Sequence, residues 1–421
     1  MEASFDKYWK MRRLYCIILI IAGVFCQIAA FACTTVIISA RKTASGKPLM
    51  LKNRDTDHIE NRMEYFTGAI YNFIGLVNSE SEGGEVWAGT NTAGFCIMNT
   101  ASYNLKDDDV PESMMDREGS LMFRALGVCA TVKDFENFLD NVSKPRGVEA
   151  NFGVIDASGG AAYYEVDNDG WVKYDVNEIP EGYRVVTNFS ESGRPEDYKG
   201  YERWLTASDI MKEMAAEAEG GVLEIGPHDL LYGFSRSYRS TMTGIDWLNG
   251  FHTLKKDSGF NGTVVDQDFI PRRSTSASIV FEGVKAGEDP LHTIMWTTLG
   301  YPCSTVTVPL LVLDSDIIPS FMKASASSRN AWMNEIALKV KNNAVFRFKL
   351  SNGSSYLDLN NVLNLLHSCL VVESRLESGW QDLYGKWTAG SVGLTEFKDR
   401  YTSFCNDYFE AYLDEFASFI Q

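Results

Sequence analysis

The residue with the clearest chemical potential is a cysteine that follows an apolar leader. The sequence around it reads Ala30-Phe31-Ala32-Cys33-Thr34-Thr35, and an apolar run from Leu14 to Ala30 precedes it. Ala30 and Ala32 supply the small side chains that a signal peptidase requires three residues and one residue before its cut. Cleavage at this point would leave Cys33 as the first residue of the mature chain, with a thiol and a free α-amine.

An N-terminal cysteine carries its own candidate base. A protonated thiol is a poor nucleophile, so it needs a base or a positive field to become a thiolate. A free α-amine has an ordinary pKa of about 7.7–8.0, which lets it accept a proton near neutral pH. We therefore predict that Cys33 is a nucleophile and that its own amine is the base.

The leader leaves two alternatives open. Its apolar run is nearly long enough to span a membrane, so an uncleaved anchor is one alternative. Lipid attachment to Cys33 is the other, although Ala30-Phe31 is a poor match to the Leu-Ala/Ser pair of lipoproteins. We predict a signal peptide over 1–32, a secreted or periplasmic mature protein, and membrane contact only through the leader before cleavage.

A second polar cluster follows the first predicted hairpin. Thr34–Ser39 and Pro48–Lys52 are β-prone runs, and the Ser45-Gly46 turn signal between them predicts antiparallel pairing. This pairing would bring Lys52-Asn53-Arg54-Asp55-Thr56-Asp57 next to Cys33. A carboxylate in that place can hold the amine, and a cation can stabilise the thiolate.

Together these motifs resemble the N-terminal-nucleophile (Ntn) amide hydrolases. The relevant branch contains choloylglycine hydrolases, penicillin V acylases, isopenicillin-N acyltransferases and related secreted dipeptidases, in which Cys-Thr is followed by an Arg-Asn-x-Asp-like motif. The resemblance implies that Asp55 is the catalytic carboxylate and that Arg54 or Lys52 is the cation. A second register would use Arg54 with Asp57.

Two later segments match the same family in the expected order. The run from Asn91 to Asn99 is similar to one that ends in an oxyanion-hole Asn, which implies that role for Asn99. Val185-Val186-Thr187-Asn188 resembles a segment whose Asn also lies in the active site, which points to Asn188. An amide N–H suits both roles, because it stabilises an oxyanion without taking up the proton of the base.

The last match is partial. Ser274–Val280 and Trp296–Ser304 resemble late segments of the family, the second one in the acyltransferase and dipeptidase branches. Bile-salt hydrolases carry an Arg at about the position of Ile279, and this chain does not. Arg272 or Arg273 could take its place in space, but the difference argues against bile salts as substrates.

The residue patterns predict a mixed chain that ends in helices. Strands are expected at 34–39, 48–52, 63–72, 86–90, 95–98, 276–282, 292–298 and 304–312, with a four-strand meander at 151–155, 161–166, 171–176 and 183–187. Helices are expected at 113–129, 132–141, 201–218, 330–341, 357–377 and 395–419. The fold class is thus α+β, and the resemblance implies a four-layer αββα sandwich with C-terminal helices. We expect a catalytic domain over 33–324 and a helical extension over 325–421.

The composition limits which partners and cofactors can be expected for this protein. Over 421 residues the net charge is −17, and neither the acids nor the bases are clustered, so no nucleic-acid partner is expected. The five histidines are isolated, and the six cysteines after the leader lack CxxC spacing, so we predict no metal and no cofactor.

These features predict an enzyme that hydrolyses the C–N bond of a linear, small-molecule amide, with acyl transfer to an amine as a variant of the same chemistry. A secreted cysteine dipeptidase is the first alternative, and a non-enzymatic, membrane-tethered binding module is the second. Because related enzymes are often tetramers, the resemblance also allows a homo-oligomer.

Overall fold

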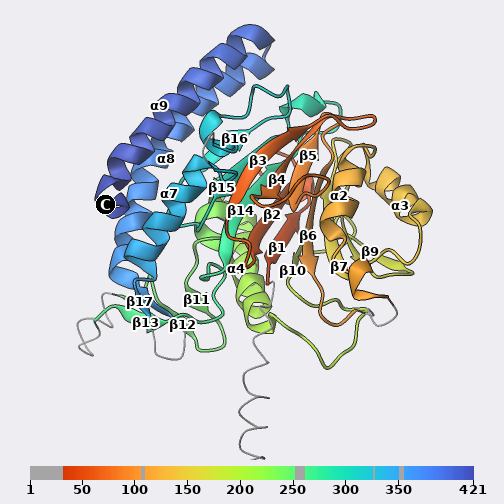
Figure 1. Ribbon diagram of the computed structural model, residues 1–421, viewed down its shortest axis with the longest axis horizontal. Helices are drawn as coiled ribbons and strands as arrows, with labels where there is room; N and C mark the ends of the chain where they lie inside the picture. The colour runs from red at the N-terminus through yellow and green to blue at the C-terminus, as the bar shows by residue number, and fades with distance from the viewer. Residues whose placement is uncertain (1–31, 106–109, 252–260, 326–327, 350–354) are drawn as a thin grey trace, which may run out of the picture. The chain divides into compact units, whose positions relative to one another are not determined.

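Two antiparallel sheets lie face to face in this protein (Figure 1). The structure is a computed structural model that describes residues 32–105, 110–251, 261–325, 328–349 and 355–421. All of the predicted signal peptide except Ala32 lies outside the described residues. The chain from Ala32 to Gln421 forms one compact unit.

The first sheet has six strands and carries Cys33 next to its second strand. Its order is β10 (Tyr183–Val186), β1 (Thr34–Ile38), β2 (Leu49–Asp55), β14 (Thr275–Glu282), β15 (Ile294–Leu299) and β16 (Thr307–Leu310). β1 and β2 pair antiparallel with Thr34 opposite Asn53 and Thr35 opposite Lys52. The predicted hairpin is therefore confirmed.

The second sheet is a seven-stranded meander that follows the order of the chain. It consists of β3 (Asn61–Phe66), β4 (Phe73–Asn78), β5 (Ala88–Asn91), β6 (Cys96–Ala101), β7 (Ala150–Ile155), β8 (Ala161–Val166) and β9 (Trp171–Asp175). Three of the four strands predicted as a late meander, β7 to β9, belong to it.

The fourth predicted meander strand was assigned to the wrong sheet. β10 does not pair with β9; it pairs with β1, with Val186 opposite Thr35. The physical reason is burial on both faces, since Val185 packs under α4 (Tyr201–Glu219) and Val186 packs between the sheets. By contrast β9 is a partly exposed edge strand, which offers no such burial.

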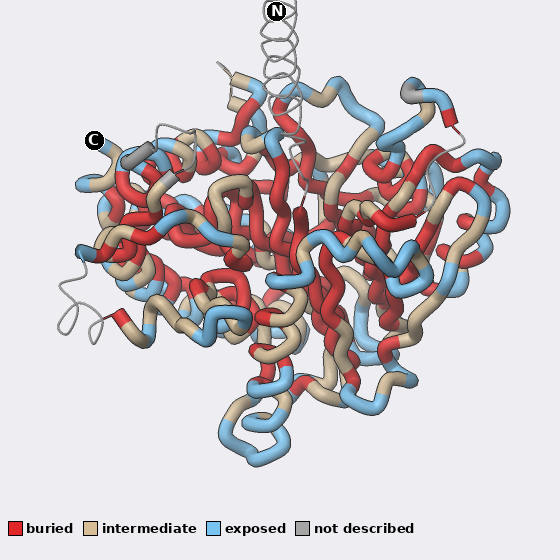
Figure 2. The backbone as a smooth tube through the Cα atoms, turned by 90° about the horizontal axis from the view of Figure 1, so that it is seen from below, coloured by how far each residue is buried: buried red, intermediate tan, exposed pale blue. Residues whose placement is uncertain are grey.

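Three hydrophobic layers hold the sheets and helices together. The strands of the two sheets are buried over most of their length (Figure 2). Between the sheets, Ile37 and Met50 of the first sheet share a core with Met98 and Tyr163 of the second. On the outer face of the first sheet, Val36, by the alternation of strand side chains, packs against α4.

The outer face of the second sheet is covered by α2 (Glu118–Leu126) and α3 (Val132–Asn141). The predicted helix 113–129 begins later than expected, because Asp116 has a positive φ of 56° that breaks the turn before Glu118. Helices thus flank two stacked sheets, and the predicted four-layer αββα class is confirmed.

The C-terminal part is mainly helical and packs on β15 and β16. It contains α7 (Trp332–Val340), α8 (Leu359–Thr388) and α9 (Leu394–Ile420), and α8 runs eleven residues past the predicted end at 377. Two short strands in this part, β17 (Phe348–Lys349) and β18 (Ser355–Asp358), are not predicted from the residue pattern; they join β13 (Thr263–Val265) in a small sheet.

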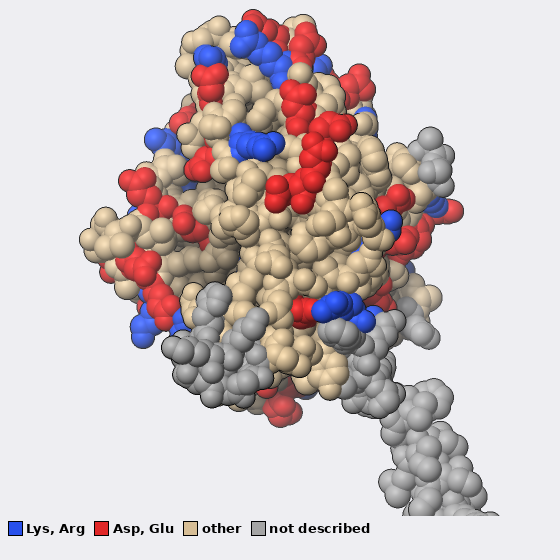
Figure 3. Space-filling model, turned by 90° about the vertical axis from the view of Figure 1, so that its left-hand side faces the viewer, with Lys and Arg blue, Asp and Glu red and all other residues tan. Residues whose placement is uncertain are grey.

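The remaining short elements are α5 (Pro227–Asp229), the π-helical turns η3 (Leu230–Phe234) and η6 (Lys341–Val345), and the strand pair β11 (Arg239–Ser240) and β12 (Ile245–Asp246). The 3-10 turns are η1 (Ala40–Lys42), η2 (Glu112–Met114), η4 (Pro290–His292) and η5 (Ser320–Met322). Within the described residues, no helix combines the length and the apolar composition needed to cross a membrane. On the face that Figure 3 shows, acidic and basic side chains are interspersed.

Candidate active site

Cys33 lies immediately before β1 and is buried. Its Sγ lies 4.0 Å from the backbone oxygen of Asp55, and its own carbonyl accepts a hydrogen bond from Arg203. In the structure Cys33 is still joined to Ala32, so the α-amine is part of a peptide bond. Alternation along the strand puts the Cys33 side chain on the same face as Thr35 and Lys52, toward the second sheet.

Lys52 connects the two sheets beside the thiol. Its Nζ donates to Asn99 Oδ1 at 2.8 Å and to the Trp87 carbonyl at 2.7 Å, and both acceptors belong to the second-sheet side. Burial lowers the pKa of Lys52 to about 8, although the nearby Cys33 and Asp55 oppose that shift. Lys52 holds the Asn99 oxygen, so the Asn99 Nδ2 group points its hydrogens elsewhere. Within the described residues, Asn99 Nδ2 donates no hydrogen bond, and its hydrogens can serve another acceptor.

Arg54 lies two residues further along β2 on the same face. Its guanidinium donates to Asn61 at 2.6 Å, to Asn78 at 2.7 Å and to Ser276 at 3.2 Å, and it lies over the Trp87 ring. Burial lowers its pKa to about 10. The guanidinium therefore ties the sheets together and already has several acceptors, whereas Lys52 contacts the predicted oxyanion residue directly.

Asp55 lies on the opposite face of β2, with a fully buried side chain. Its Oδ1 accepts from Thr275 Oγ1 at 2.6 Å, and its Oδ2 forms an ion pair with Arg272 Nε at 2.9 Å. Burial raises the pKa of Asp55 to about 6, and the cations Arg272 and Arg203 oppose the shift. Asp57, the carboxylate of the second register, is 54% exposed and pairs with His58.

Asn188 follows β10, the strand on the other side of β1, and is fully buried. Its Oδ1 accepts from Arg203 at 2.9 Å, and its Nδ2 donates to the Ala101 carbonyl at 3.0 Å. The two predicted oxyanion residues therefore come from different sheets. The pairing of β10 with β1 places Asn188 beside the start of β1, and Lys52 of β2 contacts Asn99 of β6 across the sandwich.

Arg203 is the residue that sequence reasoning missed. From α4 it donates to the Cys33 carbonyl and Thr34 Oγ1 at 2.8 Å each, and to Asn188. It also pairs with Asp268 at 2.8 Å, and Asp268 in turn pairs with Arg272. A continuous charged chain therefore joins Asn188, through the arginines and Asp268, to Asp55.

A signal for Arg203 was present in the sequence. On α4 it shares the buried stripe with Thr206, Ala207, Ile210 and Met211, where an arginine is rarely found unless it is paired. Arg272 is one of the two arginines that could replace the missing family arginine in space, and in the structure it pairs with Asp55.

Two aromatic residues complete the surroundings. Trp87 accepts a hydrogen bond from Lys52 on its backbone carbonyl, and its ring lies under the Arg54 guanidinium. The Tyr103 backbone N–H donates to the Asn188 carbonyl at 3.1 Å. Burial, together with the nearby Cys33, raises the pKa of Tyr103, so its hydroxyl stays protonated. A thiol, a cation, amide groups and a buried carboxylate thus meet at one end of β1 and β2, which is a set suited to acyl transfer.

The sequence matches no protein-family model and no curated protein. Among solved structures, an N-acylethanolamine-hydrolyzing acid amidase ortholog from Caenorhabditis elegans is 14% identical over 61% of this chain and 92% of that one, with a TM-score of 0.38. A conjugated bile acid hydrolase variant from Clostridium perfringens is 11% identical over 63% and 89%, with a TM-score of 0.35.

A penicillin V acylase from Agrobacterium tumefaciens is 14% identical over 63% of this chain and 82% of that one, with a TM-score of 0.33.

Proposed function

We propose that this protein hydrolyses the C–N bond of linear amides with Cys33 as an N-terminal nucleophile. In this proposal, removal of 1–32 outside the cytoplasm frees the α-amine and creates the base. The observation that carries the proposal is the place of Cys33 before β1, where its thiol lies on the same face as the cations Lys52 and Arg54 and its backbone carbonyl is held by Arg203.

The reaction begins at the freed Cys33. Its α-amine accepts the thiol proton, and the thiolate attacks the substrate carbonyl carbon. Asp55 lies close enough to interact with the Cys33 region, since its backbone oxygen is 4.0 Å from Sγ, and its carboxylate is assigned the task of orienting the amine. Lys52 lowers the energy of the thiolate by its positive charge.

The attack places negative charge on the carbonyl oxygen. Asn99 supplies the amide N–H groups that receive this charge, because Lys52 fixes its oxygen and turns the amide. Asn188, held by Arg203, is assigned the second position around the oxyanion. The amine then gives its proton to the leaving nitrogen as the C–N bond breaks, and an amine product leaves.

The acyl group now forms a thioester with Cys33. Water attacks this thioester with the α-amine as base, the carboxylic acid leaves, and the thiol is restored. An acceptor amine in place of water would give acyl transfer by the same steps.

A substrate panel tests the proposal. The mature protein is offered chromogenic phenylacetyl and fatty-acyl amides, N-acyl amino acids and free dipeptides, and amine release is measured. Turnover of the acyl amides supports the proposal, turnover of dipeptides alone would favour a dipeptidase, and turnover of none would favour a binding module.

The pH dependence of kcat/KM is the first prediction. Asp55 must be anionic to orient the amine, and Lys52 must be charged to stabilise the thiolate. Since the pKa values of Asp55 and Lys52 are about 6 and about 8, we expect kcat/KM to fall steeply as pH drops below 6, where protonation of Asp55 adds to protonation of the α-amine base. It should also fall as pH rises above 8, where Lys52 loses its charge. A rate measured from pH 5 to 9 tests this, and a flat profile would contradict it.

Arg203 is proposed as a positioning residue, and its replacement is the second prediction. Arg203→Lys keeps the charge but cannot reproduce the fork that reaches Cys33, Thr34 and Asn188. We expect kcat to fall roughly 10–100-fold with little change in KM, because one misplaced donor costs about that much in rate.

The pH profile separates positioning from simple support of the fold. Arg203 lowers the pKa of Asp55, so Arg203→Gln should move the acid limb to higher pH. Arg239→Lys is the matched control. Arg239 pairs with Glu213, which lies on α4 like Arg203 but on the solvent-facing side of that helix. An unshifted acid limb in Arg203→Gln would show that the residue is only structural.

A further inference from the structure

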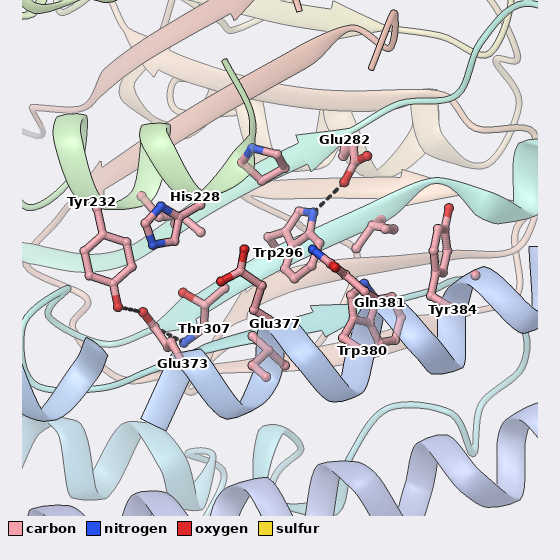
Figure 4. Close-up of a pocket in the computed structure, with 15 residues that line it drawn as sticks. His228, Tyr232, Glu282, Trp296, Thr307, Glu373, Glu377, Trp380, Gln381 and Tyr384 are labelled. Atoms are coloured by element: carbon pink, nitrogen blue, oxygen red, sulfur yellow. Dashed lines mark hydrogen bonds between the residues drawn. The ribbon is translucent and has the colours of Figure 1, made fainter. Parts of the chain in front are cut away.

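A cavity of about 350 Å³ lies on the outer face of the first sheet, away from Cys33. It is enclosed by β14 and β15, by α8, and by the α5–η3 segment (Figure 4). Strand β14 contributes Glu282 to the cavity, and seven residues earlier on the same strand Thr275 contacts Asp55 of the candidate active site. Seven residues of extended strand span about 23 Å. The cavity is therefore separate from the candidate active site, and its volume is that of a small-ligand pocket.

Helix α8 presents two adjacent rows of side chains to this cavity. Leu376, Trp380 and Tyr384 form an apolar and aromatic row at intervals of four residues. The row beside it consists of Glu373, Glu377 and Gln381 at the same interval. The cavity thus has one apolar wall and one polar wall that carries two glutamates. Trp296 of β15 lies across the cavity from α8 (Figure 4), and Ile294 of the same strand also lines it.

Two of the three carboxylates in the cavity are already neutralised. Glu373 is held by Arg236 through two contacts of 2.9 Å and accepts from the Thr307 N–H at 2.7 Å. Glu282 accepts from Trp296 Nε1 at 3.0 Å and pairs with Lys47 at 3.2 Å.

The third carboxylate, Glu377, has no ion pair or hydrogen bond with any residue that the structure describes, and the same holds for the Gln381 amide next to it. Both point from α8 toward the strands (Figure 4). The indole of Trp380 below them is 2% exposed and likewise makes no hydrogen bond within the described chain. Glu377 and Gln381 are both solvent-exposed, so an unpaired carboxylate lines the solvent-facing side of a cavity that also has aromatic walls.

We propose that this cavity binds an organic amine cation with an aromatic or short aliphatic body. The apolar body would lie against Leu376, Trp380 and Ile294, and the ammonium group would lie between Glu377 and the aromatic faces. Carboxylates together with aromatic rings select cations over neutral molecules of the same shape. An anionic ligand is disfavoured, because three glutamates line the cavity and only two have cationic partners.

The test is a calorimetric titration of the mature protein with three probes of one shape. 2-Phenylethylamine is the cation, 2-phenylethanol is the neutral match and 3-phenylpropionate is the anion. We expect the amine to bind at least about tenfold more tightly than the alcohol and the acid not to bind. Equal binding of amine and alcohol, or no binding of the amine, would overturn the proposal.

Variants locate the binding. Glu377→Gln should weaken amine binding about tenfold, whereas Asp382→Asn, on the same helix but paired with Lys386, should leave it unchanged. Cys33→Ala should also bind the amine normally, because the proposal does not depend on the chemistry of the thiol. Loss of binding in Cys33→Ala, or unchanged binding in Glu377→Gln, would assign the amine to another site and refute the inference.

Discussion

Cys33→Ala should lower kcat/KM of the mature protein by roughly 10⁴-fold or more, because no other group replaces the attacking thiolate. The substitution keeps the α-amine, and alanine is as acceptable as cysteine after the predicted cleavage point. Removing one sulfur from the end of a strand should leave the sandwich folded. The test measures amide turnover and the thermal unfolding of Cys33→Ala and of the unsubstituted mature protein.

A buried thiol from elsewhere in the chain is the control. Cys129 lies in the core under α2 and α3, and burial raises its pKa to about 12, so it has no thiolate to offer. Cys129→Ala should therefore retain full turnover at a temperature below its unfolding transition. Substantial activity in Cys33→Ala would remove the nucleophile from the mechanism.

Asp55→Asn should be the second most damaging substitution, with kcat reduced roughly 10²–10⁴-fold, the range seen when a base loses the carboxylate that orients it. The amide of Asn can still accept from Thr275, so the strand pairing is kept. It cannot balance the charge of Arg272, and it cannot hold a protonated amine.

Asp57→Asn is the matched control for Asp55→Asn. Asp57 is two residues away, 54% exposed and beside His58, so the second register would make it catalytic whereas the structure places it at the surface. We expect Asp57→Asn to keep its turnover within about twofold. A larger loss in Asp57→Asn than in Asp55→Asn would reverse the assignment of the carboxylate.

The parts of the site that could be predicted depend on local rules. A turn signal between two β-prone runs fixed the hairpin, and the hairpin register places Lys52 and Asp55 within reach of Cys33. Strand alternation then separates them, since Lys52 faces the second sheet and Asp55 the opposite side. The places of Asn99 and Asn188 were anticipated only through the family resemblance.

The parts that could not be predicted depend on packing between distant segments. Arg203 meets the Cys33 carbonyl across 170 residues, and no local pattern encodes that contact. The placement of β10 also depends on distant packing, because its short apolar run is compatible with either sheet. In the structure Val185 packs in the core under α4 and Val186 packs in the core between the sheets. The two short strands near the C-terminus were missed because they consist of only two and four residues.

The distinction between Lys52 and Arg54 also required the structure. Both are buried cations on the same face of β2, and the sequence offered no way to rank them. Arg54 is taken up by Asn61, Asn78 and Ser276, which favours a structural task. Lys52 contacts Asn99, and this contact favours Lys52 over Arg54 as the cation of the proposed mechanism.

The central claim is that cleavage creates the catalyst at Cys33, and one experiment tests it directly. The secreted protein is mixed with a slowly hydrolysed acyl amide, quenched in acid, and analysed by intact mass and by mass of its N-terminal peptide. The account predicts a chain that begins at Cys33 and carries the acyl group as a thioester on that residue. A chain that still contains the leader, a lipid on Cys33, or an acyl group on any other residue would contradict it.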